Sequence, residues 1–203
     1  MGSILGSAFV PLAGYDRAVF LVPGTPFTFV AQRSSLFALY SVLLKYQFYN
    51  HIDVRIILNS WQLMLDPAEA AGWANTNVYD NIDILAQIGL GDATVTTIAG
   101  NIFGRNMNLE LVSPSNFDVY GMNSTIPPFG KIYNHALYQG NYPVDFSNVP
   151  KTSKIPTVDS NVHSCLPSNP KIMKQTSYFI AYGDIINPCQ PNICVLDKAA
   201  ANC

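Results

Sequence analysis

The thirty residues from 36 to 65 constrain the fold most, because they are mostly apolar and almost free of charge. Their second half alternates between apolar and more polar positions, and the apolar set is Ile52, Val54, Ile56 and Leu58. A period of two residues is typical of a half-buried strand. The first half fits either a strand or a helix. We therefore expect a short helix or irregular entry up to about Ser41, a long strand, a bend at Tyr49–His51 and a second strand.

The rest of the chain predicts a mainly β fold. Short apolar runs at 18–22 and 27–31 flank a Pro-Gly-Thr-Pro turn, and residues 171–182 again have strand character. Short helices are expected directly after residue 66 and within 78–89. The sum is a single β-sandwich or jelly-roll-like domain with one or two short helices and long ordered loops.

At 203 residues, one domain is the default. We divide the chain into an N-terminal arm (1–16), a β-sandwich domain (17–183) and a Cys-containing tail (184–203). Within the domain, residues 125–170 are punctuated by Pro and Asn, and their aromatic side chains argue for ordered loops rather than disorder.

The chain carries few charges, because only 12% of its residues are Asp, Glu, Lys or Arg, against about 25% in typical domains. Charged residues are depleted in interface cores, so we expect copies of this chain or sister subunits to cover much of the surface. A secreted, loop-rich protein with a neutral surface is the alternative. The net charge of −2 gives no global nucleic-acid signature. The sequence contains no apolar run of about 18 residues, so we expect no transmembrane helix. The N-terminus lacks the basic region of a signal peptide.

Four cysteines, Cys165, Cys189, Cys194 and Cys203, lie in the last fifth of the chain. They fit two disulfides with three possible pairings, or four free thiols in a reducing compartment. His163 lies two residues before Cys165, so the two side chains face the same side of an extended chain and form a candidate base and nucleophile. A metal site made of His163 and the first three cysteines is less consistent with zinc-ligand spacing than disulfides or free thiols are.

The remaining candidate sites are contact or modification sites. Asp53 and Arg55 share one face of the expected strand, so they form a possible assembly face or a solvated surface. Asn123 begins a glycosylation sequon. A local basic region could contact nucleic acid or an acidic partner, and its members are Lys151, Lys154, Lys171 and Lys174. The sequence predicts no cofactor, since the GLGD segment at 89–92 lacks the Lys and the spacing of a phosphate loop.

The stretch 36–65 resembles the early part of picorna-like viral capsid subunits. A short apolar helix (36–40) precedes aromatic residues at 46, 48 and 49, an alternating strand (52–58) that contains Arg55, and Asn59-Ser60. The resemblance implies a jelly-roll subunit without enzymatic activity that assembles into a shell.

Three functions follow in order of preference. The first is a structural subunit of a large assembly, a viral or phage capsid protein located in the virion. The second is a secreted, extracellular binding or membrane-active β-sandwich, such as a lectin-like or toxin-like module. The third is a thiol enzyme that uses Cys165 and His163.

Overall fold

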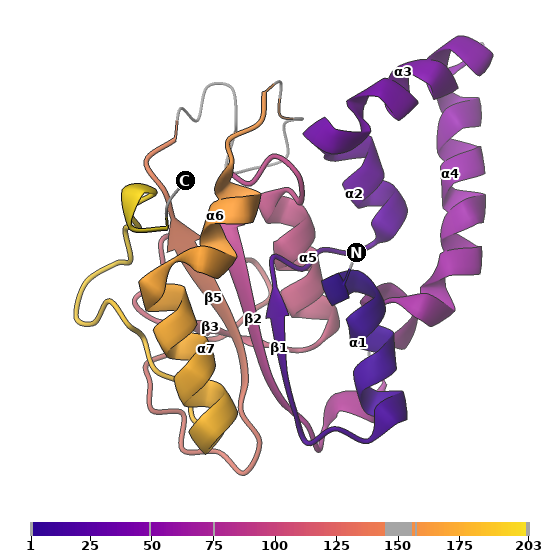
Figure 1. Ribbon diagram of the computed structural model, residues 1–203. Coiled ribbons are helices and arrows are strands. Elements are labelled where there is room, and N and C mark those ends of the chain that lie inside the picture. The colour runs from indigo at the N-terminus through magenta and orange to yellow at the C-terminus, as the bar shows by residue number, and fades with distance from the viewer. Residues whose placement is uncertain (1, 49, 75, 145–155, 157, 202–203) are drawn as a thin grey trace.

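Five parallel strands form the centre of the structure, in the order β1-β2-β5-β3-β4 (Figure 1). The structure is a computed structural model that describes residues 2–48, 50–74, 76–144, 156 and 158–201. Every strand pair in the described residues is parallel. The strands are β1 (Arg17–Leu21), β2 (Asp83–Leu90), β3 (Glu110–Val112), β4 (Ser124–Thr125) and β5 (His135–Asn141).

Helices cover both faces of this sheet (Figure 1). One apolar core lies between the sheet and α6 and α7, and a second lies on the opposite face, where α5 packs. Helix α1 precedes β1 and packs against it. The α-helices are α1 (Gly2–Ala13), α2 (Phe27–Arg33), α3 (Ala38–Gln47), α4 (His51–Leu65), α5 (Thr97–Asn106), α6 (Val162–Ser168) and α7 (Pro170–Tyr182). Short 3-10 helices occupy Ser35–Phe37, Asp66–Ala68, Ala70–Trp73, Asn77–Tyr79 and Ala199–Ala201.

Strand β2 shows why these residues form a covered parallel sheet. Ile84 and Ile88 belong to the core on the α5 face, whereas Leu85 belongs to the core on the α7 face. Gln87 points to α7, where its amide donates a buried hydrogen bond of 2.7 Å to Gln175 Oε1. Parallel strands that are covered on both faces are apolar along their whole length rather than at alternate positions. The prediction of a helix within 78–89 is therefore wrong, because its apolar run is a fully buried strand.

The stretch 36–65 is helical, which corrects the strongest strand prediction. The side chain of Asn50 accepts a hydrogen bond from the backbone N–H of Ile52 and so caps α4. Asn is among the preferred N-cap residues. Ile52 and Ile56, and likewise Val54 and Leu58, are four residues apart and thus neighbours on a helix surface. Their alternation in sequence arises because this helix carries apolar residues on two sides.

The expected strand at 171–182 is helix α7. Asn169 caps this helix through a hydrogen bond from the N–H of Lys171, Pro170 occupies the first turn, and Gly183 ends it with a left-handed φ of 74°. Pro at the start and Gly just past the end are typical of a helix. Residues 27–31 form α2 instead of a strand, and residues 2–13 of the expected N-terminal arm form α1. The strand prediction at 18–22 agrees with β1.

The fold class predicted from sequence is therefore wrong. The described residues contain seven α-helices and one parallel sheet, which is an α/β architecture and not a β-sandwich or jelly roll. The jelly-roll fold was one basis of the capsid interpretation, and that basis is absent, whereas the low charge content on which it also rested is unchanged. No helix in the described part of the chain has both the length and the apolar composition to cross a membrane alone.

A helical arm is inserted between β1 and β2. It consists of α2, α3 and α4, and we call it the α2–α4 arm (residues 27–65). In Figure 1 it stands beside the sheet, with α3 at the end far from the strands.

Candidate functional site

At the carboxyl ends of the central strands, a buried carboxylate lies next to a partly exposed imidazole. Strand β2 ends at Leu90 and is followed by Gly91 and Asp92, while the chain after the neighbouring strand β5 leads to α6, which carries His163. Open α/β sheets bind ligands at the carboxyl ends of their strands. The topology therefore brings together two residues that are 71 positions apart.

Asp92 and His163 form a directed hydrogen bond. His163 Nδ1 lies 2.8 Å from Asp92 Oδ2. The Asp92 side chain is 1% exposed and the His163 side chain is 32% exposed. The other carboxylate oxygen, Oδ1, accepts the backbone N–H groups of Thr94 at 2.7 Å and Val95 at 2.9 Å. Both oxygens of the buried Asp92 carboxylate are thus held in fixed directions.

This arrangement selects one of the two tautomers of the neutral imidazole. An ionised carboxylate only accepts hydrogen bonds, so Nδ1 of His163 carries the proton that it donates to Asp92. The lone pair of a neutral His163 then lies on Nε2. A carboxylate that orients an imidazole in this way also stabilises the imidazolium that forms when Nε2 takes up a proton.

Two side-chain hydroxyl groups hold the loop of Asp92 in place, one from just before α6 and one from the start of α5. Ser160 Oγ donates a 2.7 Å hydrogen bond to the carbonyl of Gly91, and Thr97 Oγ1 accepts the N–H of Gly91 at 3.0 Å. Gly89 packs directly against Val162, since a Cβ at Gly89 would lie 2.3 Å from Val162 Cγ1. Only a residue without a side chain allows β2 and α6 to approach so closely.

His163 faces a hollow of about 200 Å³. We call it the His163 hollow, and its lining residues are Gly2, Ser3, Ile4, Leu21, Val22, Val95 and His163. The first turn of α1, the end of β1 and the loop after β2 therefore meet His163 at this hollow. Ser3 is the hydroxyl-bearing residue of this lining, and its Oγ donates to the carbonyl of Leu21 at 2.6 Å.

Backbone strain marks the same place. Val22, directly after β1, has a φ of 45°. A positive φ is unfavourable for a β-branched residue, and such strain clusters at functional sites. The N–H of Val22 donates to the carbonyl of Gln87 at 2.8 Å, which holds this conformation in place.

The cysteines form disulfides. Cys189 is bonded to Cys194, and Cys165 is also disulfide-bonded. Cys203 lies outside the described residues. The thiol-enzyme hypothesis needs a free Cys165 next to His163, and the disulfide removes that nucleophile. The described residues contain no group of three His, Cys, Asp or Glu side chains that could hold a metal ion.

The other predicted contact residues do not gather into one site. Arg55 lines a hollow in the α2–α4 arm, whereas Asp53 is exposed in the first turn of α4. Asn123 is exposed just before β4. The predicted basic region divides, because Lys171 and Lys174 lie on α7 while Lys151 and Lys154 fall outside the described residues.

Sequence reasoning missed Asp92 and gave His163 the wrong partner. The segment GLGD was tested only as a phosphate loop. Its informative feature is an acidic residue placed just after a continuous apolar run that ends in Gly, which is how a buried parallel strand and its terminal loop look in sequence. Comparison of the chain with protein-family models, with curated proteins and with solved structures gave no match.

Proposed function

We propose that this protein is a hydrolase that cleaves carboxylic esters and uses Asp92 and His163 as its acid–base pair. The observation that carries the proposal is the 2.8 Å contact between buried Asp92 Oδ2 and half-exposed His163 Nδ1 at the edge of the His163 hollow. A general base needs a free lone pair within reach of the substrate, and His163 Nε2 has it. The proposal replaces the structural-subunit interpretation, whose jelly-roll basis is absent.

The hollow suits an ester with an apolar acyl group. Four of its lining residues are aliphatic: Ile4, Leu21, Val22 and Val95. The first-turn N–H groups of an α-helix have no partner within the helix, and the residues of that turn of α1 line the hollow. These N–H groups, together with the positive end of the helix dipole, favour negative charge on a substrate oxygen.

The reaction follows from these parts. His163 Nε2 takes the proton from a nucleophilic hydroxyl group as its oxygen attacks the carbonyl carbon of the ester. The carbonyl π electrons move to the oxygen, which becomes an oxyanion near the first turn of α1. Asp92 stays ionised and stabilises the imidazolium. The oxyanion then re-forms the carbonyl as the bond to the alcohol oxygen breaks, and His163 returns the proton to that oxygen. With water as the nucleophile, this step releases the carboxylic acid. With a serine, it leaves an acyl ester on the serine, which a water molecule deprotonated by His163 Nε2 then hydrolyses by the same two steps.

Two nucleophiles are compatible with this pair. Ser3 lines the hollow and precedes Asp92 and His163 in the chain, and the order Ser, Asp, His is that of α/β-hydrolases. Its surroundings depart from the Gly-x-Ser-x-Gly motif, because the glycines are Gly2 and Gly6, and its hydroxyl donates to Leu21. A water molecule activated by His163 is the alternative.

Hydrolysis of short-chain p-nitrophenyl esters by the purified chain tests the proposal. We expect activity in the wild type and its loss in His163→Ala under conditions where circular dichroism shows that the variant is folded, because the buried Asp92 Oδ2 loses a partner and some stability is lost with it. His135→Gln is the matched control, because His135 lies at the opposite end of the sheet and Gln can still donate to the carbonyl of Ile82. Equal activity in wild type and His163→Ala would refute the proposal.

A fluorophosphonate probe followed by peptide mass spectrometry identifies the nucleophile. A label on Ser3 that is absent from Ser3→Ala assigns the nucleophile to this residue. An absent label combined with ester hydrolysis that depends on His163 assigns it to water. A label on another serine moves the nucleophile but keeps the role of the Asp92–His163 pair.

A further inference from the structure

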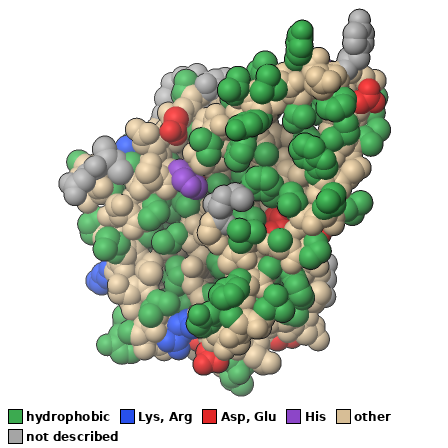
Figure 2. Space-filling model, turned by 45° about the vertical axis from the view of Figure 1, so that its right-hand side comes forward, with side chains coloured by type: hydrophobic (Ala, Val, Ile, Leu, Met, Phe, Trp, Pro, Cys, Tyr) green, Lys and Arg blue, Asp and Glu red, His purple; other side chains and the backbone are tan. Residues whose placement is uncertain are grey.

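The α2–α4 arm exposes an unusual amount of apolar side-chain surface. Eight of the ten residues of α3 are exposed and none is buried, and α4 buries only Leu58. Figure 2 shows apolar side chains gathered over this part of the molecule. The exposed large apolar residues of the arm are Leu36, Leu39, Tyr40, Val42, Leu43, Tyr46, Ile52, Ile56, Trp61, Leu63 and Met64. Surface patches of this size mark interaction sites.

The exposed apolar residues of α4 are not confined to one side of the helix. At about 100° per residue from the buried Leu58, Ile52, Ile56 and Leu63 lie at about 120° to 160°, Met64 at about 240° and Trp61 at about 300°. A single folded partner covers one face of a helix. A helix that is apolar on widely separated sides suits a surrounding apolar medium better.

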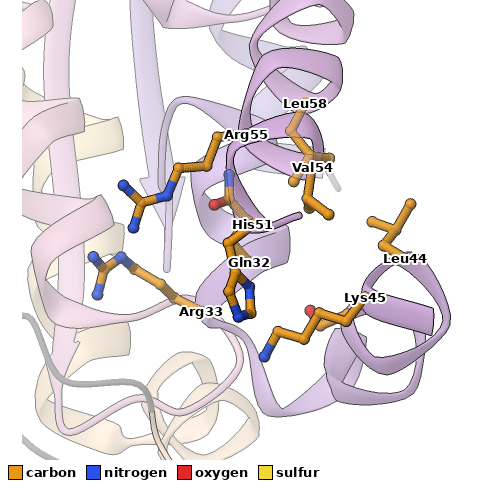
Figure 3. Close-up of a pocket in the computed structure, with 9 residues that line it drawn as sticks. Gln32, Arg33, Leu44, Lys45, His51, Val54, Arg55 and Leu58 are labelled. Carbon is orange, nitrogen blue, oxygen red and sulfur yellow. The ribbon is translucent and has the colours of Figure 1, made fainter. Parts of the chain in front are cut away.

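Cationic side chains from three helices gather within the arm. A hollow of about 260 Å³ lies between α2, α3 and α4 (Figure 3), and the cationic side chains of Arg33, Lys45 and Arg55 line it together with the imidazole of His51. We call it the cationic hollow. Asp53 is the arm's only acidic residue, and neither Lys45 nor Arg55 forms an ion pair with any residue that the structure describes. The positive charge of the hollow therefore favours an anionic group.

We propose that the α2–α4 arm docks on a lipid surface whose headgroups carry anionic phosphate. The cationic hollow binds a phosphate group, while the exposed apolar side chains around it enter the acyl-chain boundary. Aromatic side chains with a polar end favour the lipid–water boundary, and the arm exposes Tyr40, Tyr46 and Trp61. Helix α2 and the helical segment 35–47 meet at 78° and together reach the length and composition of a membrane span, which suits a bent, interfacial segment.

Lipid docking goes beyond the proposed ester hydrolysis and is tested without any substrate. Binding is measured by flotation with vesicles of phosphatidylcholine alone, or of phosphatidylcholine mixed with phosphatidylglycerol. We expect binding to the mixed vesicles and little binding to the neutral ones. A cation near an anionic surface contributes about 1 kcal/mol, so Lys45→Gln with Arg55→Gln should weaken binding about 30-fold. Leu39→Ser with Leu43→Ser should abolish it.

Two matched controls carry the same chemical changes elsewhere. Lys171→Gln with Lys174→Gln removes the same net charge from α7, and Ile132→Ser changes an apolar residue that is 91% exposed. Both should bind the mixed vesicles like the wild type. Equal weakening by the α7 pair would overturn the proposal, because global charge would then explain the binding.

Two further outcomes would also overturn it. Binding of inorganic phosphate at the cationic hollow without vesicle binding would mean that the hollow serves a soluble anion. A wild-type dimer that Leu39→Ser with Leu43→Ser converts to a monomer, again without vesicle binding, would assign the apolar surface to a second copy of the chain. Sedimentation velocity and phosphate titration calorimetry measure these outcomes.

Discussion

Replacing Asp92 by Asn separates the two tasks of this carboxylate, which are to hold its own loop and to set the proton of His163. The carbonyl of the introduced amide can still accept the N–H groups of Thr94 and Val95, which lie 2.7 and 2.9 Å from Oδ1. The amide NH₂ then faces His163 Nδ1 and donates, so the imidazole must accept at Nδ1. The ring proton moves to Nε2, and the lone pair at Nε2 that the general base needs is lost.

The expected magnitudes differ sharply between two variants. Asp92→Asn should lower the rate of ester hydrolysis about 10⁴-fold, the effect of a wrong imidazole tautomer in a serine protease, with little loss of stability. Asp92→Ala should destabilise the fold by about 1–2 kcal/mol, because two partly buried N–H groups lose their acceptor.

Two measurements check this reasoning. Nitrogen-15 NMR of the histidine rings reports which nitrogen of His163 carries the proton, and the signals missing from His163→Gln assign this residue. Urea unfolding reports the free energy of unfolding. The expected result is an Nδ1-protonated ring in the wild type and an Nε2-protonated ring in Asp92→Asn. An unchanged tautomer in Asp92→Asn, or equal destabilisation by the two substitutions, would refute the argument.

Three further predictions concern the scaffold. Gly89→Ala should cost about 1–3 kcal/mol through overpacking, because its Cβ would lie 2.3 Å from Val162 Cγ1; adding Val162→Ala should restore the melting temperature, and a lack of rescue would contradict the packing argument. Burial raises the pKa of Tyr79 from 10.0 to about 12. As the pH rises, the unfolded state therefore loses this proton first, and the free energy of unfolding should fall between these two pH values. Tyr79→Phe should make that decline shallower in urea unfolding. Glu69 is buried and accepts hydrogen bonds from Thr25 Oγ1 and the N–H of Phe27. Glu69→Ala should therefore lower the free energy of unfolding by about 2–4 kcal/mol and speed hydrogen exchange in α2. Unchanged exchange would mean that Glu69 does not anchor the arm.

The helices were missed although their end signals are present in the sequence. Asn50 caps α4, and Asn169 with Pro170 and Gly183 delimits α7. Periodicity failed because α4 is apolar on two sides, so a period of two and a spacing of four fit the same residues. In α7 the buried Ile172 and Phe179 are seven residues apart, a spacing of two helical turns.

The candidate site was only partly accessible from the sequence. His163 was singled out, but its partner was sought among neighbours in sequence. A hydrogen bond across 71 positions follows from the parallel pairing of β2 with β5, which places the ends of both strands at one edge of the sheet. A β-sandwich has no edge at which the carboxyl ends of parallel strands meet. The predicted fold therefore gave no reason to pair Asp92 with His163.

The position of the α2–α4 arm in the chain couples the two proposed activities. The arm follows β1, and Val22 at the end of β1 lines the His163 hollow in a strained conformation. Glu69 fixes the base of the arm to that same connection through Thr25 and Phe27. An arm seated on a lipid surface would therefore hold this connection, and with it one wall of the hollow, close to that surface. Vesicle binding in the inactive Asp92→Asn variant at wild-type strength, together with faster hydrolysis of vesicle-bound than of soluble esters by the wild type, is the combination that this geometry predicts.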